Sequence, residues 1–272
     1  MKRNILIIAT AIIGMALISC TINVDGETFG VETIKGNGNV VTQNYNVNAF
    51  NEISTSLPAT INFTVSNDYT CVVRVDENIM EYLDIKVDEQ DLVMKKQEKH
   101  KNAILRATEF VIEVTAPSLE DINLAGSGAL YVLSPMEGNE IEVNLAGSGD
   151  VIFKQQLSLN EIELNLAGSG NIECYELVAD RLDANVAGSG DLRVKAGTVT
   201  KAEASVAGSG DCDLYCEIDT LDANIAGSGD IKARVSGKLK YSIIGSGDIG
   251  YYGDPIVEGD KVGHGKATRL GD

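Results

Sequence analysis

The tripeptide Gly-Ser-Gly occurs seven times between residues 126 and 247 of this chain. Successive copies start 21, 21, 20, 20, 19 and 18 residues apart, and Gly263-His264-Gly265 follows after another 18. A nearly constant period of this size is typical of a solenoid, in which each repeat forms one coil. The copies are Gly126-Ser127-Gly128, Gly147-Ser148-Gly149, Gly168-Ser169-Gly170, Gly188-Ser189-Gly190, Gly208-Ser209-Gly210, Gly227-Ser228-Gly229 and Gly245-Ser246-Gly247.

Apolar or small residues flank every triplet with a period of two. They stand four and two positions before the first glycine, and four and six positions after it. Around the third copy these residues are Leu164, Leu166, Ile172 and Cys174, and the residues between them are mostly polar. This alternation predicts that one strand runs into the triplet and another runs out of it. Glycine permits the positive φ that a tight bend between them needs.

One such unit cannot bury its apolar face alone, so the units must stack. We therefore predict an all-β fold, a right-handed parallel β-helix with coils of 18–21 residues spaced about 4.8 Å apart. Leucine-rich repeats lack a Gly-Ser-Gly bend, the calcium-binding nonapeptide has a shorter period, and a dinucleotide-binding loop occurs once and opens a helix. The second bend of each coil is expected near Gly138-Asn139, Ser158, Asp180, Gly197, Asp219 and Gly237.

Residues 1–19 have the pattern of an export signal. Lys2 and Arg3 precede an apolar segment that is too short to span a bilayer. The sequence Leu17-Ile18-Ser19-Cys20 resembles the lipobox of bacterial lipoproteins, and this resemblance implies that Cys20 becomes the lipid-modified first residue. Residues 20–32 would then be a tether. The alternative is an ordinary signal peptide followed by an incidental cysteine.

The chain without residues 1–19 is strongly acidic. It keeps 20 of the 22 basic residues and all 40 acidic ones, a net charge of −20. This charge argues against nucleic acid or anionic lipid as a partner. Cys71, Cys174, Cys212 and Cys216 are expected to be buried free thiols, because strand rise and coil spacing hold the repeat cysteines too far apart for a disulfide.

Residues 33–117 are rich in predicted strands but lack the triplet. Strands are expected over residues 39–47, 50–56, 59–65 and 71–75, and a hairpin over 85–87 and 92–95. Since open β edges need cover, this part is expected to extend the β-helix irregularly and to cap it. The regular repeats then occupy residues 118–272.

The stretch from Gly36 to Val41, Gly-Asn-Gly-Asn-Val-Val, precedes Phe50 and Ile53, and the tandem motif is Ala-Gly-Ser-Gly-Asp. Over residues 31–270 this pattern resembles the family of the putative auto-transporter adhesin, head GIN domain. The resemblance implies a right-handed parallel β-helix in which Gly-Ser-Gly bends separate two sheets, similar to pectin-lyase-type folds without their catalytic residues. It also implies an exported lipoprotein with an adhesive role, at the outer membrane or cell surface.

Stacking converts each repeat position into a ladder of side chains. The position three residues after the first glycine forms an aspartate ladder, which Asn171 interrupts. Two carboxylates about 4.8 Å apart in water repel each other by only about 0.9 kcal/mol, so the ladder can exist without a ligand. It either keeps an exported protein soluble or forms a row of weak Ca²⁺ sites. Its members are Asp150, Asp191, Asp211, Asp230 and Asp248.

Two further ladders precede the triplets. An acidic ladder stands five residues before the first glycine and contains Asp121, Glu142, Glu163, Asp183, Glu203 and Asp222. An asparagine ladder stands two residues later and contains Asn123, Asn144, Asn165, Asn185 and Asn224. Stacked amides are expected to bond to one another along the solenoid.

An enzymatic function is the main alternative to binding. β-Helical polysaccharide lyases use Asp-bound calcium and a basic residue, and Arg193 and Lys232 stand beside the aspartate ladder. A regular repeat nevertheless lacks the local break in symmetry that a catalytic site needs. We expect no enzyme and no cofactor beyond weak calcium, but a binding or adhesion module with a glycan or protein ligand, a lipid-anchored membrane contact and a capacity to form homo-oligomers. A structural envelope scaffold is a further alternative.

Overall fold

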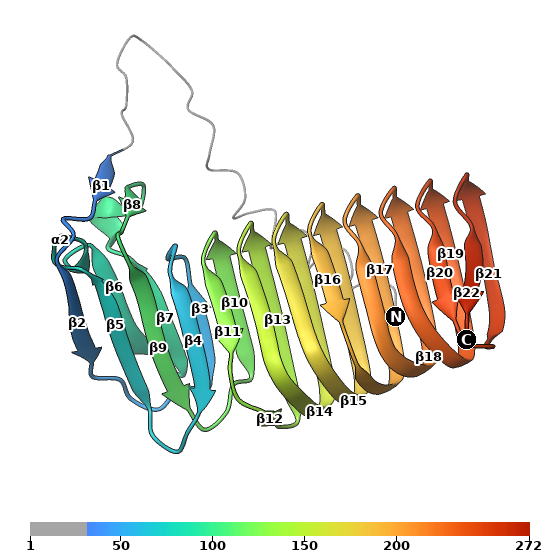
Figure 1. The fold of residues 1–272 in the computed structure, drawn as a ribbon, viewed down its shortest axis with the longest axis horizontal. Coiled ribbons are helices and arrows are strands. Elements are labelled where there is room, and N and C mark those ends of the chain that lie inside the picture. The colour runs from blue at the N-terminus through green and yellow to red at the C-terminus, as the bar shows by residue number, and fades with distance from the viewer. Residues whose placement is uncertain (1–31) are drawn as a thin grey trace, which may run out of the picture.

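The computed structural model describes residues 32–272. The predicted signal, Cys20 and residues 20–31 of the tether lie outside this range. The described chain is 70% strand and 3% helix, and its stacked parallel coils form a β-solenoid of about 8 turns (Figure 1). This architecture confirms the predicted fold class.

Twenty-two strands and two short helices, α2 (Glu77–Met80) and η1 (Glu98–His100), make up the described chain. The strands are β1 (Thr33–Lys35), β2 (Val40–Tyr45), β3 (Glu52–Thr55), β4 (Thr60–Val65), β5 (Thr70–Asp76), β6 (Leu83–Asp88), β7 (Asp91–Lys96), β8 (Ile104–Arg106), β9 (Phe110–Ala116), β10 (Asp121–Gly126), β11 (Ala129–Val132), β12 (Met136–Glu137), β13 (Glu140–Gly147), β14 (Asp150–Gly168), β15 (Asn171–Gly188), β16 (Asp191–Val194), β17 (Gly197–Gly208), β18 (Cys212–Gly227), β19 (Ile231–Gly245), β20 (Ile249–Tyr252), β21 (Ile256–Gly263) and β22 (Ala267–Gly271).

Each coil contributes one segment to each of two parallel sheets. The segments that run into the triplets form the incoming sheet, which contains β10, β13, the later parts of β14, β15, β17, β18 and β19, and β21. The segments that leave the triplets form the outgoing sheet, which contains β11, the first parts of β14 and β15, β16, the first parts of β18 and β19, and β20 and β22. The triplets therefore lie at the corner where the two sheets meet.

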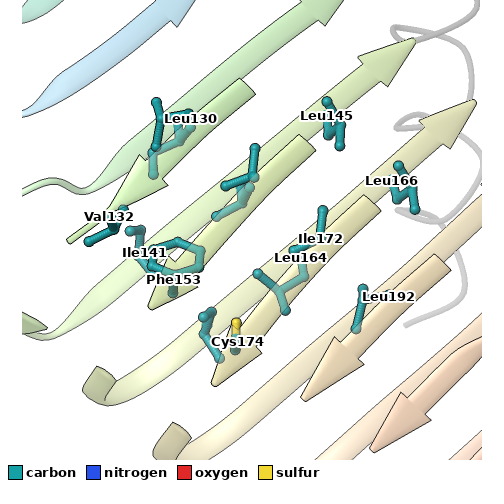
Figure 2. Close-up of a cluster of buried hydrophobic side chains, with 14 of the residues drawn as sticks. Leu130, Val132, Ile141, Leu145, Phe153, Leu164, Leu166, Ile172, Cys174 and Leu192 are labelled. Carbon is teal, nitrogen blue, oxygen red and sulfur yellow. The ribbon is translucent and has the colours of Figure 1, made fainter. Parts of the chain in front are cut away.

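The core lies between the sheets, as the period-two pattern predicts. Leu164 and Ile172 are fully buried. Figure 2 shows side chains from successive coils, such as Leu145 and Leu166, repeated along the same sheet. Because coils pair position for position, each inward residue packs on its counterpart, and burying one such side chain contributes about 1.5–3 kcal/mol.

The coil has one more side than the sequence predicts. Between the two sheets, residues such as Gln156–Leu159 pair with the next coil as a short third segment, separated from the outgoing strand by a register shift after Phe153. Ser158 lies within this segment and does not form the expected bend, whereas Gly197, with a φ of +113°, begins the equivalent segment directly after a bend at Ala196. Pairing is interrupted instead at Asn160 and Thr200, and also at the predicted Asp180, Asp219 and Gly237.

Both sheets continue through the predicted boundary at residue 117. β3 and β4 pair in parallel with β10 and β11, and β7 and β9 pair beyond them. The antiparallel strands β2, β5 and β6 then close this end. The predicted hairpin is present as β6 and β7. Two further strands, β8 and β9, follow this hairpin before the first triplet.

A buried carboxylate holds this closing region together. Asp76 is fully buried and accepts hydrogen bonds from the N–H groups of Gly38 (2.7 Å) and Thr108 (2.6 Å) and from the Thr108 hydroxyl (2.9 Å). Burial alone would raise the pKa of Asp76, but these hydrogen bonds hold it below its usual value. The Gly-Asn-Gly stretch is thus a loop around Asp76, and a Cβ on Gly36 would lie 2.4 Å from that carboxylate.

Candidate functional site

The structure brings the predicted bend residues into one line along the solenoid. The Ser169 N–H donates to the carbonyl of Gly147 at 2.7 Å, and every other triplet after the first repeats this bond to the coil before it. Gly168 has a φ of +134°, and a Cβ there would lie 2.1 Å from the Gly147 oxygen. A Cβ on Gly170 would lie 2.0 Å from the Gly149 oxygen. The triplets therefore have a structural function, which is close contact between successive coils.

The aspartate ladder binds the backbone of the next coil. The Asp211 carboxylate accepts the N–H of Asp230 at 2.9 Å, and Asp230 accepts that of Asp248 at 2.8 Å. Asp150 and Asp191 make the equivalent bonds at 3.2 and 3.3 Å. One oxygen of each carboxylate thus has a structural partner. Within residues 32–272 no group of three or more His, Cys, Asp or Glu residues could hold a metal ion, and calcium binding by this ladder stays a prediction.

The asparagine ladder is a chain of hydrogen bonds on the outside of the incoming sheet. The amide of Asn165 donates to Asn144 at 3.1 Å, and that of Asn185 donates to Asn165 at 3.0 Å. Asn165 also donates to Glu163 of the acidic ladder at 3.0 Å. The asparagines therefore support the neighbouring carboxylates.

The acidic ladder is longer than the repeats. Asp121 pairs on one side with Glu142 and on the other with Glu52, which in turn pairs with Asp91. Burial raises the pKa of Asp121 to about 6, and the charges of Glu142, Glu52 and Asp91 add to the effect. Burial also raises the pKa of Glu163. The ladder thus stores electrostatic repulsion that the fold has to overcome.

A different pattern covers the outside of the outgoing sheet. Seven residues after the first glycine, cations and tyrosines alternate over six consecutive coils. We call this set the tyrosine–cation row. The Lys195 Nζ lies 3.7 Å from the ring centre of Tyr175, and the Arg234 Cζ lies 5.4 Å from that of Tyr252. The row consists of Lys154, Tyr175, Lys195, Tyr215, Arg234 and Tyr252.

Charged residues lie beside this row, five residues after the first glycine. The predicted residues Arg193 and Lys232 flank Asp213, which is only 8% exposed. Arg193 contacts Asp191 at 2.8 Å and Asp213 at 3.4 Å, and the Lys232 Nζ lies 3.7 Å from Asp213. The charge of Asp213 raises the pKa of Lys232. A lysine with a raised pKa stays protonated at neutral pH and is a poor general base.

The outgoing face differs in charge from the rest of the repeats. Residues 121–272 contain 24 acidic and 12 basic residues, a net charge of −12. The outward positions of the outgoing strands, which are the third, fifth and seventh after each first glycine, carry five cations (Lys154, Arg193, Lys195, Lys232 and Arg234) against seven carboxylates (the aspartate ladder, Glu173 and Asp213), a net charge of −2. The seventh position alone carries three cations and no carboxylate. The sequence analysis missed this face, although the alternation at the seventh position was present in the sequence.

The cysteines and the grooves are the remaining candidates for a reactive or binding site. The four described cysteines are free and buried, and burial raises the pKa of Cys71 and of Cys216 to about 12. Such thiols are unreactive at neutral pH. One shallow groove of about 500 Å³ crosses the third side of the coils near Val199, and another of about 670 Å³ lies near Met80.

The chain matches the family described as putative auto-transporter adhesin, head GIN domain, over residues 49–173 and 143–255. It belongs to this family, as the sequence pattern predicts. No curated protein matches it. Membership points to an adhesin-like protein at the cell surface and away from an enzyme. In the described part of the chain, no helix is long and apolar enough to cross a membrane.

Three solved structures have the same fold. A crystal structure described as a putative lipid binding protein from Parabacteroides distasonis ATCC 8503 is 32% identical, with a TM-score of 0.85. Putative adhesins from Parabacteroides merdae ATCC 43184 and Parabacteroides distasonis ATCC 8503 are 25% and 26% identical, with TM-scores of 0.81 and 0.82. Each comparison covers 88% of this chain and 100% of the other.

Proposed function

We propose that this protein is an exported, lipid-anchored, non-catalytic adhesin that binds its ligand through the outgoing face of the solenoid. The observation that carries the proposal is the tyrosine–cation row. Tyrosine and arginine are enriched among the residues that dominate binding energy at protein surfaces. Here they gather in one row, at the seventh position after the triplets, on a solenoid that is acidic overall.

A lyase or hydrolase fits this face less well. Arg193 and Lys232 are the candidates for a proton-abstracting base, and both are paired with carboxylates. Asp191 and Asp213 raise the pKa of Arg193 despite the opposing effect of its burial, and Asp213 raises that of Lys232. A catalytic base needs the opposite shift. The regular ladders also offer no single place where several reactive groups converge.

The proposed location follows from the N-terminal sequence together with the family. The Leu17–Cys20 pattern supports a lipid anchor at Cys20, and an adhesin must be exposed to meet its ligand. A tether of about 12 residues would span at most about 40 Å when extended, which is enough to hold the solenoid clear of a membrane surface.

The test uses intact cells that produce the full-length protein. Externally added protease should degrade the protein on intact cells, and deletion of its gene should reduce attachment to a surface coated with the natural ligand source, such as host extracellular matrix. Restoring the intact gene should restore attachment. Full protection from protease on intact cells, with degradation after the outer membrane is opened, would rule out an adhesive role.

A further inference from the structure

The tyrosine–cation row has a regularity that the fold does not require. Burial in the core restricts the inward positions of a coil to apolar or small residues, and close contact between coils restricts the outer positions of the triplets to glycine. The seventh position points outward and has neither restriction. Tyr175 and Tyr215 are 41% and 37% exposed. A strict alternation of cation and ring over six coils, at positions that are exposed in four coils and half-buried at Arg234 and Tyr252, therefore needs an explanation outside the core.

The spacing of the row is set by the stacking of the coils. Neighbouring members stand one coil apart, about 4.8 Å, and members of the same kind stand two coils apart, about 9.6 Å. Lys154, Lys195 and Arg234 thus recur on every second coil with a tyrosine between each pair. Register shifts at this corner leave Lys154 without a direct partner and pair Arg234 with Glu217, which it contacts at 3.2 Å. A receptor with translational repetition fits a ligand that repeats along its own length.

We propose that the outgoing face binds a linear acidic polysaccharide, with the glycan chain lying along the solenoid axis. This inference rests on the proposed binding function and names its ligand class. An extended glycan with one uronate in each disaccharide would present a carboxylate at about every second coil. Lys154, Lys195 and Arg234 would pair with these carboxylates, and the edges and hydroxyls of Tyr175 and Tyr215 would contact the intervening sugars.

The charges already present on the face prepare it for such a ligand. Lys154 lies 4.5 Å from the ring centre of Tyr131, and it makes no ion pair within the described chain. Lys195 shares its charge between the Tyr175 ring and Glu173 at 2.9 Å. These long side chains are exposed, so they can turn from the rings toward a glycan carboxylate while keeping their place on the row.

An acidic polysaccharide also fits the charge of the whole molecule better than an anionic membrane does. A flat bilayer would approach the acidic corners beside the outgoing face, where Asp191, Asp211 and Asp230 lie, and it would be repelled there. A single glycan chain is narrow enough to contact the row alone. Ionic screening beyond about 8 Å at physiological salt limits repulsion from the other sides of the solenoid.

The experiment measures binding of the full-length protein, purified in detergent, to hyaluronan, in which every second sugar carries a carboxylate. Carboxyl-reduced hyaluronan, with the same backbone and no charge, is the matched ligand. We expect binding to hyaluronan, weakening with added salt, and at least about tenfold weaker binding to the reduced polymer, since the charge-assisted hydrogen bonds to the carboxylates would be lost.

Two triple variants of equal net charge test the location. Lys154→Ala/Lys195→Ala/Arg234→Ala removes the cations of the row, and it should weaken hyaluronan binding at least about tenfold. Lys201→Ala/Lys238→Ala/Lys240→Ala removes three cations from the incoming sheet, and it should leave binding within about twofold. Circular dichroism and melting temperatures would establish that both variants are folded.

Three outcomes would overturn the proposal. They are equal losses in the two triple variants, equal binding of native and carboxyl-reduced hyaluronan, and binding to vesicles of phosphatidylglycerol without binding to either polysaccharide. If these occur while cells that carry the protein still attach to matrix, the ligand class is wrong and the adhesive function stands. Loss of both would remove the proposed function as well.

Discussion

Replacing Asp121 by asparagine should stabilise the protein at neutral pH. Asp121 lies in the acidic ladder between Glu52 and Glu142, and its pKa is raised from 3.8 to about 6. A shift of about two units corresponds to at most about 3 kcal/mol of unfavourable free energy in the charged form. Because Asp121 keeps partial access to water and shares its repulsion with its neighbours, we expect a gain of about 1–3 kcal/mol.

The sign of the pH dependence follows from the raised pKa. Between about pH 4 and pH 6 the folded protein holds a proton on Asp121 that the unfolded chain releases, so stability falls as the pH rises through this window. The penalty is complete above pH 6 and absent below pH 4. Asp121→Asn should therefore raise the melting temperature by several degrees at pH 7.5, at about 3 °C per kcal/mol, and change it little at pH 4.

The assay is thermal unfolding by circular dichroism at pH 7.5 and pH 4 for the native protein, Asp121→Asn and Glu137→Gln. Glu137 is an exposed carboxylate on β12, outside the acidic ladder, and its replacement removes the same charge. An increase that is equal at both pH values, or equal in the control variant, would show that the charged form of Asp121 carries no penalty in the folded protein.

Three further predictions concern the bends, the anchor and calcium. Gly170→Ala should destabilise the protein by more than 2 kcal/mol, because its Cβ would lie 2.0 Å from the Gly149 oxygen. Gly138→Ala, whose Cβ would meet only Leu159 at 3.4 Å, should be tolerated. Equal denaturant midpoints for the two variants would contradict this prediction. Cys20→Ala should abolish acylation and release the protein into the soluble fraction, and retention in membranes after a high-salt wash would refute the lipobox. Millimolar Ca²⁺ bound with a Kd of about 10⁻⁴ M would add about 1.4 kcal/mol per site to the free energy of unfolding. The melting temperature should therefore be higher in calcium than in EDTA. Equal melting temperatures would mean that the aspartate ladder makes only its hydrogen bonds to the backbone.

The coil register could be predicted from the sequence because the repeat contains its own alignment. Residues at equal distance from the triplet, such as Leu145 and Leu166, must pair if the coils stack, and they do. The third side of the coil was missed because its corner is not marked by one recurring residue: it has neither glycine nor proline at Lys154 and Gln155, whereas equivalent corners of other coils hold Pro135, Gly197 or Gly253. The apolar pair Leu157 and Leu159 was the available signal, since both are buried in the short segment.

Features outside the repeats were much harder to predict. Asp76 is not part of a repeat, and its partners Gly38 and Thr108 are 38 and 32 residues away in the sequence. No local pattern therefore reveals the contact. The acidic ladder was predicted within the repeats, but its continuation through Glu52 and Asp91 depends on strands that return to the first coil from distant parts of the chain.

The tyrosine–cation row could be predicted only in part. The alternation of its residues is present in the sequence, but the sequence alone does not show that they lie on one face. Once the outgoing strands are placed, the fifth and seventh positions must point outward, and the alternation becomes a surface. The cation–π contacts within the row are worth only about 0.5–1 kcal/mol each at exposed sites, less than one buried side chain of the core. Stability alone therefore gives little reason for this order of residues, whereas the asparagine and aspartate ladders of the same coils are explained by bonds to their neighbours. A surface that the fold does not need, and that repeats with the coil, is where a function of this solenoid should be sought.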